Sequence, residues 1–161
     1  MEVTINIEGL AALDQKLMKM ETAVAKRIAR RALTAGAKIV QRKTMSSALQ
    51  IVGGMMSYEI WNSIIIKTLR MGRTSVYRVG VMIDPKANDT FVYLTKRKNP
   101  GKRYYIPAAI EFGHKTPKSR RKVAEMPFMR KAAEATMSLA AAAIAATLKT
   151  EIEKQTQKSG S

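Results

Sequence analysis

The chain has 161 residues, of which 46% are hydrophobic and 25% are charged, and this composition is typical of one globular domain and excludes wholesale disorder. Its 29 Lys and Arg residues against 12 Asp and Glu residues give a formal net charge of +17, so the expected partners are polyanions or acidic protein surfaces. The lack of cysteine excludes disulfides and thiolate chemistry, and no apolar run reaches the roughly 18 residues that span a bilayer.

The first part of the sequence predicts one short strand and one long helix. Apolar and polar residues alternate over 2–8, which indicates a half-buried strand. From residue 10 the apolar residues recur at steps of three and four, which predicts a helix over about 10–46, kinked or broken near Glu21-Thr22 or at Gly36. The opposite face of this helix is basic, a pattern that also occurs in helices that lie on membranes or nucleic acid.

A flexible connection and several short strands are expected next. Residues 46–57 contain a Gly-Gly pair and several methionines, which favours a flexible connection. Runs rich in β-branched and aromatic residues at 60–69, 75–83 and 91–94 predict three strands, and an arm that begins at Tyr104 predicts a fourth.

Two basic loops hold more than half of the excess charge. The first, 96–103, surrounds a Pro-Gly turn, and the second, 115–125, lies between Gly113 and Pro127. Because such loops have almost nothing apolar to bury, we expect them to be exposed, flexible and available to a partner or to DNA. The candidate docking or DNA-facing residues are Lys96, Arg97, Lys98, Lys102, Arg103, Lys115, Lys118, Arg120, Arg121 and Lys122.

The second loop is expected to be anchored at both ends. Gly113 follows a bulky aromatic residue, which favours a tight turn or a positive φ, and Pro127 suits the first turn of a helix. Glu111 lies between two apolar residues, so we expect it to be partly buried and hydrogen-bonded, either to Arg130 of the same chain or across a contact between protomers.

Taken together, these patterns predict an α+β fold. A second long helix should run from Pro127 to about residue 154, followed by a frayed tail over 155–161. The expected architecture is a single domain over 1–161, in which an antiparallel sheet of about four strands packs against two long helices.

The sequence offers little from which to build an active site. His114 is the sole histidine and has no obvious carboxylate to orient it. Asp84 and Asp89 are separated by a turn and Glu111 stands alone, so no metal site is indicated. The phosphate-binding P-loop and the dinucleotide-binding pattern are both missing. We therefore predict a protein that is not an enzyme and has no catalytic residue, no metal and no cofactor.

Three short motifs carry a resemblance to a known family. Residues 110–114 read IEFGH, residues 126–132 read MPFMRKA and residues 60–64 read IWNSI. With these motifs in this order, the chain resembles the tail-completion or head–tail joining proteins of the necks of tailed bacteriophages. The residues that carry the structural part of the motif are Glu111, Phe112, Gly113, Pro127, Phe128 and Arg130.

The resemblance implies a structural virion protein of the siphophage neck. Such a protein is assembled in the host cytoplasm and forms a ring, expected to be a hexamer, that joins the head connector or stopper protein to the tail tube protein and lets DNA pass. The basic loops would then dock onto acidic surfaces of these neighbours or touch genomic DNA without reading its sequence; no membrane partner is implied. The alternative that composition leaves open is a basic nucleic-acid-binding protein that is not part of a virion.

Overall fold

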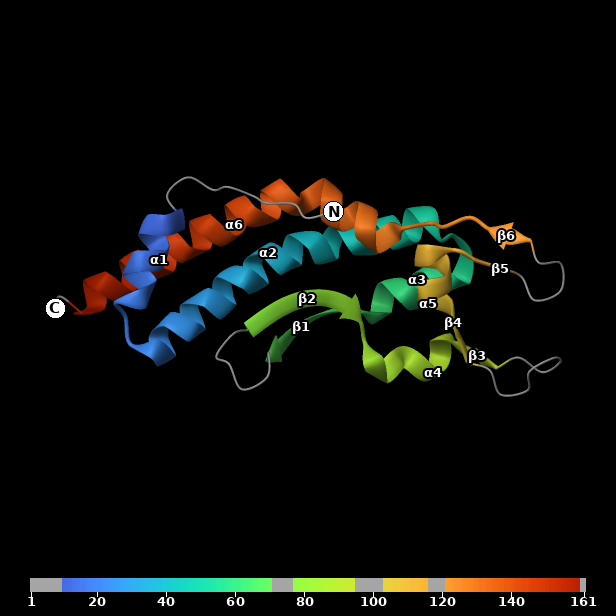
Figure 1. The fold of residues 1–161 in the computed structure, drawn as a ribbon, viewed down its shortest axis with the longest axis horizontal. Helices are drawn as coiled ribbons and strands as arrows, with labels where there is room; N and C mark the ends of the chain where they lie inside the picture. The colour runs from blue at the N-terminus through green and yellow to red at the C-terminus, as the bar shows by residue number, and fades with distance from the viewer. Residues whose placement is uncertain (1–9, 71–76, 95–102, 116–120, 160–161) are drawn as a thin grey trace. The chain divides into compact units, whose positions relative to one another are not determined.

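The computed structural model describes residues 10–70, 77–94, 103–115 and 121–159, most of which lie in helices (Figure 1). The helical elements are α1 (Leu10–Met18), α2 (Thr22–Ile51), α3 (Gly54–Ser63), the 3-10 turn η1 (Pro85–Ala87), α4 (Asn88–Phe91), α5 (Ile106–Phe112) and α6 (Phe128–Ser159). The strands are β1 (Ile64–Arg70), β2 (Tyr77–Ile83), β3 (Val92–Leu94), β4 (Arg103–Tyr105), β5 (His114–Lys115) and β6 (Lys122–Val123). With 30 residues in α2 and 32 in α6, the fold mixes helix and strand and contains two long helices, as the sequence predicts in outline.

The first long helix begins at residue 10 as predicted and differs from the prediction at its other end. The strand predicted over 2–8 lies outside the described residues. The break expected near Glu21-Thr22 is present, because α1 stops at Met18 and α2 begins at Thr22, whereas α2 continues without interruption through Gly36. At its other end α2 reaches Ile51, past the predicted limit of residue 46.

The segment 46–57, predicted to be a flexible connection, is helical except at Val52 and Gly53. The N–H of Val52 still donates to the carbonyl of Ala48 at 3.1 Å, and Gly53 then turns the chain with φ +68° and ψ 164°. Glycine reaches this region of φ without steric cost. The Gly-Gly pair therefore makes a sharp corner between two helices.

The predicted single sheet of about four strands is wrong for the described residues. Their strands pair two by two, β1 with β2, β3 with β4 and β5 with β6. A helical segment, η1 and α4, separates β2 from β3, where a simple turn was expected. It starts because the Asp84 carboxylate accepts the N–H of Lys86 at 3.0 Å and Pro85 occupies the first helical position. Strand β1 also begins four residues later than predicted, because α3 extends to Ser63.

The contacts within the chain divide it into two compact units. Unit 1 contains residues 1–40, 66–80 and 136–161, and unit 2 contains 41–65 and 81–135. We describe each unit by itself, and the single domain expected from the sequence remains a prediction.

Unit 2 has an apolar core that fixes the start of α6. Its buried members come from α2, α3, β1, β2, α4 and α6, and they are Ala48, Ile60, Ile64, Ile83, Phe91 and Phe128. The side-chain amide of Gln41 donates to the carbonyl of Ile64 at 2.8 Å, which ties β1 to α2. Since Phe128 is the first residue of α6 and is 0% exposed, the beginning of that helix is held in this core.

Unit 1 is built on a close approach of α2 and α6. A Cβ added to Gly36 would lie 2.7 Å from Cγ1 of Ile144 and 3.0 Å from the carbonyl oxygen of Ala140. Glycine inside a helix lowers its stability by about 1 kcal/mol relative to alanine. Its presence at position 36 is explained by the close approach of α6, which leaves no room for a side chain. Small buried residues line both helices nearby, including Ala32, Ala140 and Ala141.

Within the described residues, no helix combines sufficient length with sufficient apolar character to cross a membrane.

Candidate functional site

Glu111 is a buried carboxylate in the last turn of α5. Only 5% of the residue is exposed, and a carboxylate removed from water needs hydrogen-bond partners. The backbone N–H of Met129 donates to its Oε2 at 3.0 Å, and the backbone N–H of Arg130 donates to its Oε1 at 2.9 Å. Glu111 therefore accepts hydrogen bonds from two N–H groups in the first turn of α6. These N–H groups have no acceptor within the helix, because no helical carbonyl precedes them.

Helix α6 needs this external cap because Pro127 precedes it. The carbonyl of Pro127 accepts the N–H of Lys131 at 3.3 Å, so Pro127 occupies the capping position. Proline has no side-chain oxygen with which to bind the free N–H groups, a task that Ser, Thr, Asp or Asn usually performs from that position. The Glu111 carboxylate takes over this task from α5, and its negative charge also lies at the positive end of the helix dipole.

Arg130 holds the carboxylate from the other side. Its Nε donates to Oε1 of Glu111 at 3.2 Å, and its Nη2 donates to the main-chain oxygen of Glu111 at 2.9 Å and to Oε2 of Glu125 at 2.8 Å. Its Cζ lies 5.2 Å from the centre of the Phe112 ring, a cation–π distance. The Glu111–Arg130 pair predicted from the sequence is thus present, and it forms within one chain.

Glu125 and Arg130 each stabilise the charged form of the other. The hydrogen bond from Arg130 lowers the pKa of Glu125, and the attraction of the same guanidinium adds to that effect. In return, the hydrogen bond to Glu125 raises the pKa of Arg130 above its already high value. Both groups therefore stay charged throughout the physiological pH range.

Gly113 joins α5 to the strand that follows and has the positive φ that the sequence predicts. Its φ is +70° and its ψ is 171°, a region that is populated almost exclusively by glycine. A Cβ at this position would also lie 2.7 Å from the carbonyl oxygen of Val123 and 3.0 Å from the backbone nitrogen of Glu125. Both the backbone conformation and the available space therefore require glycine here.

A two-stranded hairpin extends from this point. Strands β5 and β6 pair antiparallel with Lys115 opposite Lys122, and the N–H of Met126 donates to the carbonyl of Ile110 at 2.8 Å. Like charges directly opposite each other weaken a strand pair. The hairpin is therefore held at its base. We call the residues at this base the clasp, and they are Glu111, Phe112, Gly113, Glu125 and Arg130.

The basic hairpin, residues 114–123, exposes those cations that the structure describes. Lys115, Arg121 and Lys122 are all exposed. The other charges predicted for this loop and for the first loop lie outside the described residues, namely Lys96, Arg97, Lys98, Lys102, Lys118 and Arg120. Arg103 lies in β4, whose backbone pairs with β3 in the register Leu94 opposite Arg103.

Two members of the clasp have roles that the sequence did not reveal. Glu125 is the second carboxylate on Arg130, and Phe112, although 66% exposed, lies under the guanidinium. The available signal for Glu125 was that it is the only acidic residue between Glu111 and Glu134. For Phe112 there was no signal, because a bulky apolar residue before a turn is expected to be buried.

A metal-binding cluster does not accompany the clasp in the part of the chain that the structure covers. Among those residues, no three His, Asp or Glu side chains come together as a group that could hold a metal ion. His114 lies with Nδ1 3.5 Å from the carbonyl oxygen of Ala109, at the limit of a hydrogen bond.

Comparison with protein-family models, with curated proteins and with solved structures gives no match for this chain. The family resemblance therefore depends on the residues of this sequence alone.

Proposed function

We propose that this protein is a structural, non-catalytic component of the neck of a tailed bacteriophage. In this proposal, copies of the chain form a ring, expected to be a hexamer, between the head connector or stopper protein and the tail tube protein, and DNA passes through the ring. The contact between neighbouring copies would be heterologous and would close by rotation.

The observation that supports this proposal is the clasp. Two of the three motifs that carry the family resemblance, residues 110–114 and 126–132, meet in the structure, because Glu111 of the first caps the helix that begins within the second. A conformationally demanding glycine and a buried carboxylate are used here to fix the base of an exposed hairpin. Such a fixed base beside the exposed cations Lys115, Arg121 and Lys122 is suited to docking a neighbouring protein.

In the proposed assembly, the basic hairpin docks onto an acidic surface of the connector or tube protein. Opposite charges across the interface would steer encounter and fix the register, and the contact would weaken as salt screens the charges. Docking to protein is preferred over lining the channel, since a channel crowded with positive charge would slow the passage of DNA.

The test is negative-stain imaging with mass determination of the full chain, alone and mixed with candidate connector and tail-tube proteins, over a salt series. Six-fold rings, or rings that form with one of these partners and dissociate at high salt, are the expected result. A stable monomer that ignores both partners and binds duplex DNA with a steep salt dependence would contradict the proposal and favour a nucleic-acid-binding protein outside virions.

A matched pair of variants tests the hairpin itself. The triple variant Lys115→Gln, Arg121→Gln, Lys122→Gln removes three charges from the basic hairpin, and Lys43→Gln, Arg78→Gln, Lys86→Gln removes the same number from exposed positions elsewhere. We expect the first variant to lose partner binding or to dissociate at lower salt, and the second to behave as the wild type. Equal loss in both would show that docking depends on net charge alone.

A further inference from the structure

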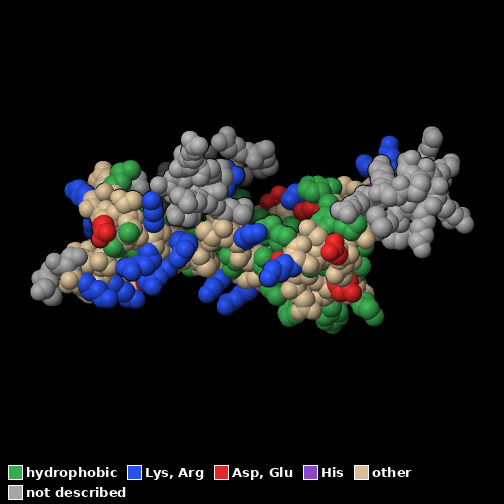
Figure 2. Space-filling view, turned by 90° about the horizontal axis from the view of Figure 1, so that it is seen from below, with side chains coloured by type: hydrophobic (Ala, Val, Ile, Leu, Met, Phe, Trp, Pro, Cys, Tyr) green, Lys and Arg blue, Asp and Glu red, His purple; other side chains and the backbone are tan. Residues whose placement is uncertain are grey.

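A second basic surface lies in unit 1 and is made of other residues than those of the hairpin. Figure 2 shows Lys and Arg side chains gathered over the part of the molecule where Figure 1 draws the beginning of α2 and the end of α6. Between these two helix segments is an open groove of about 620 Å³, and its charged lining is Arg27, Arg31, Glu151, Lys154 and Lys158. We call it the α2–α6 groove.

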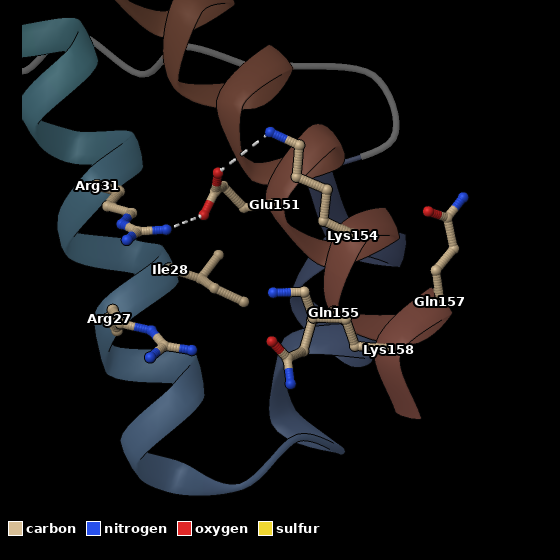
Figure 3. Close-up of a pocket in the computed structure, with 8 residues that line it drawn as sticks. All are labelled: Arg27, Ile28, Arg31, Glu151, Lys154, Gln155, Gln157 and Lys158. Carbon is tan, nitrogen blue, oxygen red and sulfur yellow. Dashed lines mark hydrogen bonds and ion pairs between the residues drawn. The ribbon is translucent and has the colours of Figure 1, made fainter. Parts of the chain in front are cut away.

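The groove collects four cations around one carboxylate. Glu151 is held by Arg31 at 2.6 Å and by Lys154 at 3.8 Å, and Figure 3 shows the guanidinium groups of Arg27 and Arg31 extending from α2 toward α6. Among the described residues, no carboxylate forms an ion pair with Arg27 or Lys158. The side chains of Arg31 and Lys154 remain 60% and 65% exposed. The groove thus has more cationic groups than its single carboxylate can neutralise, and these groups are available to an anionic ligand.

Helix stability alone does not explain this arrangement. Lys158 lies in the last turn of α6, where the helix dipole favours a cation. Arg27 and Arg31 lie toward the start of α2, where the dipole gives no such advantage. In addition, each helix carries two like charges four residues apart, namely Arg27 and Arg31 in α2 and Lys154 and Lys158 in α6. This spacing of like charges destabilises an isolated helix. A bound polyanion would relieve the repulsion within and between these two pairs.

The shape of the groove favours a chain of phosphates over a single anion. A spacing of four residues places the two cations of each helix about 6 Å apart along its axis, so the charge is spread along the groove. The groove is open, whereas a compact anion is held by donors that converge in an enclosed site. Arginine guanidinium groups match two oxygens of a phosphate, and contacts to phosphate carry no sequence information.

We propose that the α2–α6 groove binds the phosphodiester backbone of nucleic acid without reading its sequence. This inference concerns other residues than the docking hairpin, and it holds for a neck protein and for a nucleic-acid-binding protein alike. An acidic protein segment and a free oligophosphate are the competing ligands, and the experiment below separates them.

The experiment measures binding of the full chain to two fluorescent 30-base-pair duplexes of unrelated sequence over a salt series. The groove variant is Arg27→Gln, Lys158→Gln, which spares the Arg31–Glu151 pair. Each lost phosphate contact lowers the slope of log affinity against log salt by about 0.9, so we expect a decrease of about 1.8 and roughly tenfold weaker binding near 0.1 M salt, equally for both duplexes. The control variant, Arg78→Gln, Lys86→Gln, changes the net charge equally but lies outside the groove lining.

Several results would overturn the proposal. These are no binding of the wild type at low salt, an equal loss of slope in the control variant, or an unchanged slope in the groove variant whose circular dichroism matches that of the wild type. Displacement of the duplex by an equimolar amount of inorganic tripolyphosphate would assign the groove to a free oligophosphate. Binding of a poly-glutamate peptide as tight as that of DNA at equal salt would assign it to acidic protein.

Discussion

At the scale of single residues, the capping role of Glu111 predicts a loss of stability when its carboxylate is removed. Replacement by alanine removes the cap of α6 and leaves the N–H groups of Met129 and Arg130 without their acceptor. From the typical cost of a lost cap and of an unpaired buried donor, we expect Glu111→Ala to lower the free energy of unfolding by about 2 kcal/mol. Urea unfolding followed by circular dichroism measures this difference.

Two further variants separate capping from general charge effects. Glu111→Gln keeps one carbonyl oxygen as an acceptor and should destabilise less than Glu111→Ala. Glu134→Ala removes an exposed carboxylate from the same helix and should change stability by no more than about 0.5 kcal/mol. If Glu111→Ala and Glu134→Ala were equally mild, the capping role of Glu111 would be refuted.

A comparison of Gly113 with Gly53 separates the cost of backbone strain from the cost of steric overlap in the free energy of unfolding. Gly53 and Gly113 have nearly the same conformation, with φ +68° and ψ 164° against φ +70° and ψ 171°. A Cβ on Gly53 meets nothing within 4 Å, whereas one on Gly113 lies 2.7 Å from the Val123 carbonyl oxygen. We expect Gly53→Ala to cost about 1–2 kcal/mol from backbone strain and Gly113→Ala at least about 1 kcal/mol more, measured by the same unfolding experiment. Equal costs would mean that the backbone around Val123 yields to the added methyl group.

At the scale of elements, the packing of α2 on α6 depends on Gly36. Alanine is the better helix former by about 1 kcal/mol, but its Cβ would overlap Cγ1 of Ile144 and approach the carbonyl oxygen of Ala140. Since overpacking typically costs about 1–3 kcal/mol, we expect Gly36→Ala to be destabilising overall and Gly36→Val more so.

A double-mutant cycle with Ile144→Ala identifies the cause. Once the isoleucine is shortened, Gly36→Ala should cost less than it does in the wild type, because the two closest atoms are gone. Additive effects of the two substitutions would argue against a close approach of α2 and α6 at this position.

The Arg31–Glu151 pair, which links the same two helices, predicts a pH dependence. The hydrogen bond from Arg31 lowers the pKa of Glu151 below its ordinary value of 4.5. A carboxyl group whose pKa is lowered on folding contributes stability that is complete above the unfolded value and is lost as pH falls through the folded value. We therefore expect Glu151→Gln to have a slightly lower Tm than the wild type at pH 7, and the difference to shrink progressively as the pH falls below 4.5.

Thermal scans from pH 7 to pH 3, each at low and high salt, check this expectation. The pair is solvent-accessible, so salt should reduce the difference at pH 7 as well. A difference in Tm that persisted at pH 3 would have to come from something other than the ionised carboxylate.

The sequence predicted elements well where one local signal dominated. The two long helices followed from apolar periodicity, and the turn at Gly113 and the helix after Pro127 followed from backbone chemistry. It failed at 46–57, because helix propensity on both sides of the Gly-Gly corner outweighed the breaking effect of glycine. It also failed for the sheet, because pairing between strands depends on the chain path between them, and the helical turn begun by Asp84 and Pro85 redirects that path.

The site was predictable only in part, for a similar reason. The Glu111–Arg130 pair could be inferred from a carboxylate between apolar residues and a basic residue after Pro127. The capping of α6 by Glu111 could not, since it joins residues 18 and 19 positions apart across a hairpin. The groove between α2 and α6 could not either, because Arg31 and Glu151 are 120 positions apart.

At the scale of the whole molecule, the positive charge is expected to serve two separate surfaces. The basic hairpin belongs to unit 2 and the α2–α6 groove to unit 1. If the two proposals are both right, the hairpin triple variant should lose partner binding while keeping the salt slope for duplex DNA, and the groove double variant should do the opposite. The two binding assays, applied to both variants, measure this directly. Loss of both functions in each variant would mean that a single diffuse field of charge is responsible.

The clasp also separates the part of the chain that fixes the fold from the hairpin that, in the proposed function, would meet a partner. Its contacts end at the base of the hairpin, where Lys115 faces Lys122, so they do not depend on what connects these two positions. Doubling the length of a flexible connection costs only about 0.6 kcal/mol in closure entropy. If the hairpin docks as proposed, evolution or an engineer can therefore exchange this connection for another sequence and direct the protein to a new neighbour while the clasp stays the same.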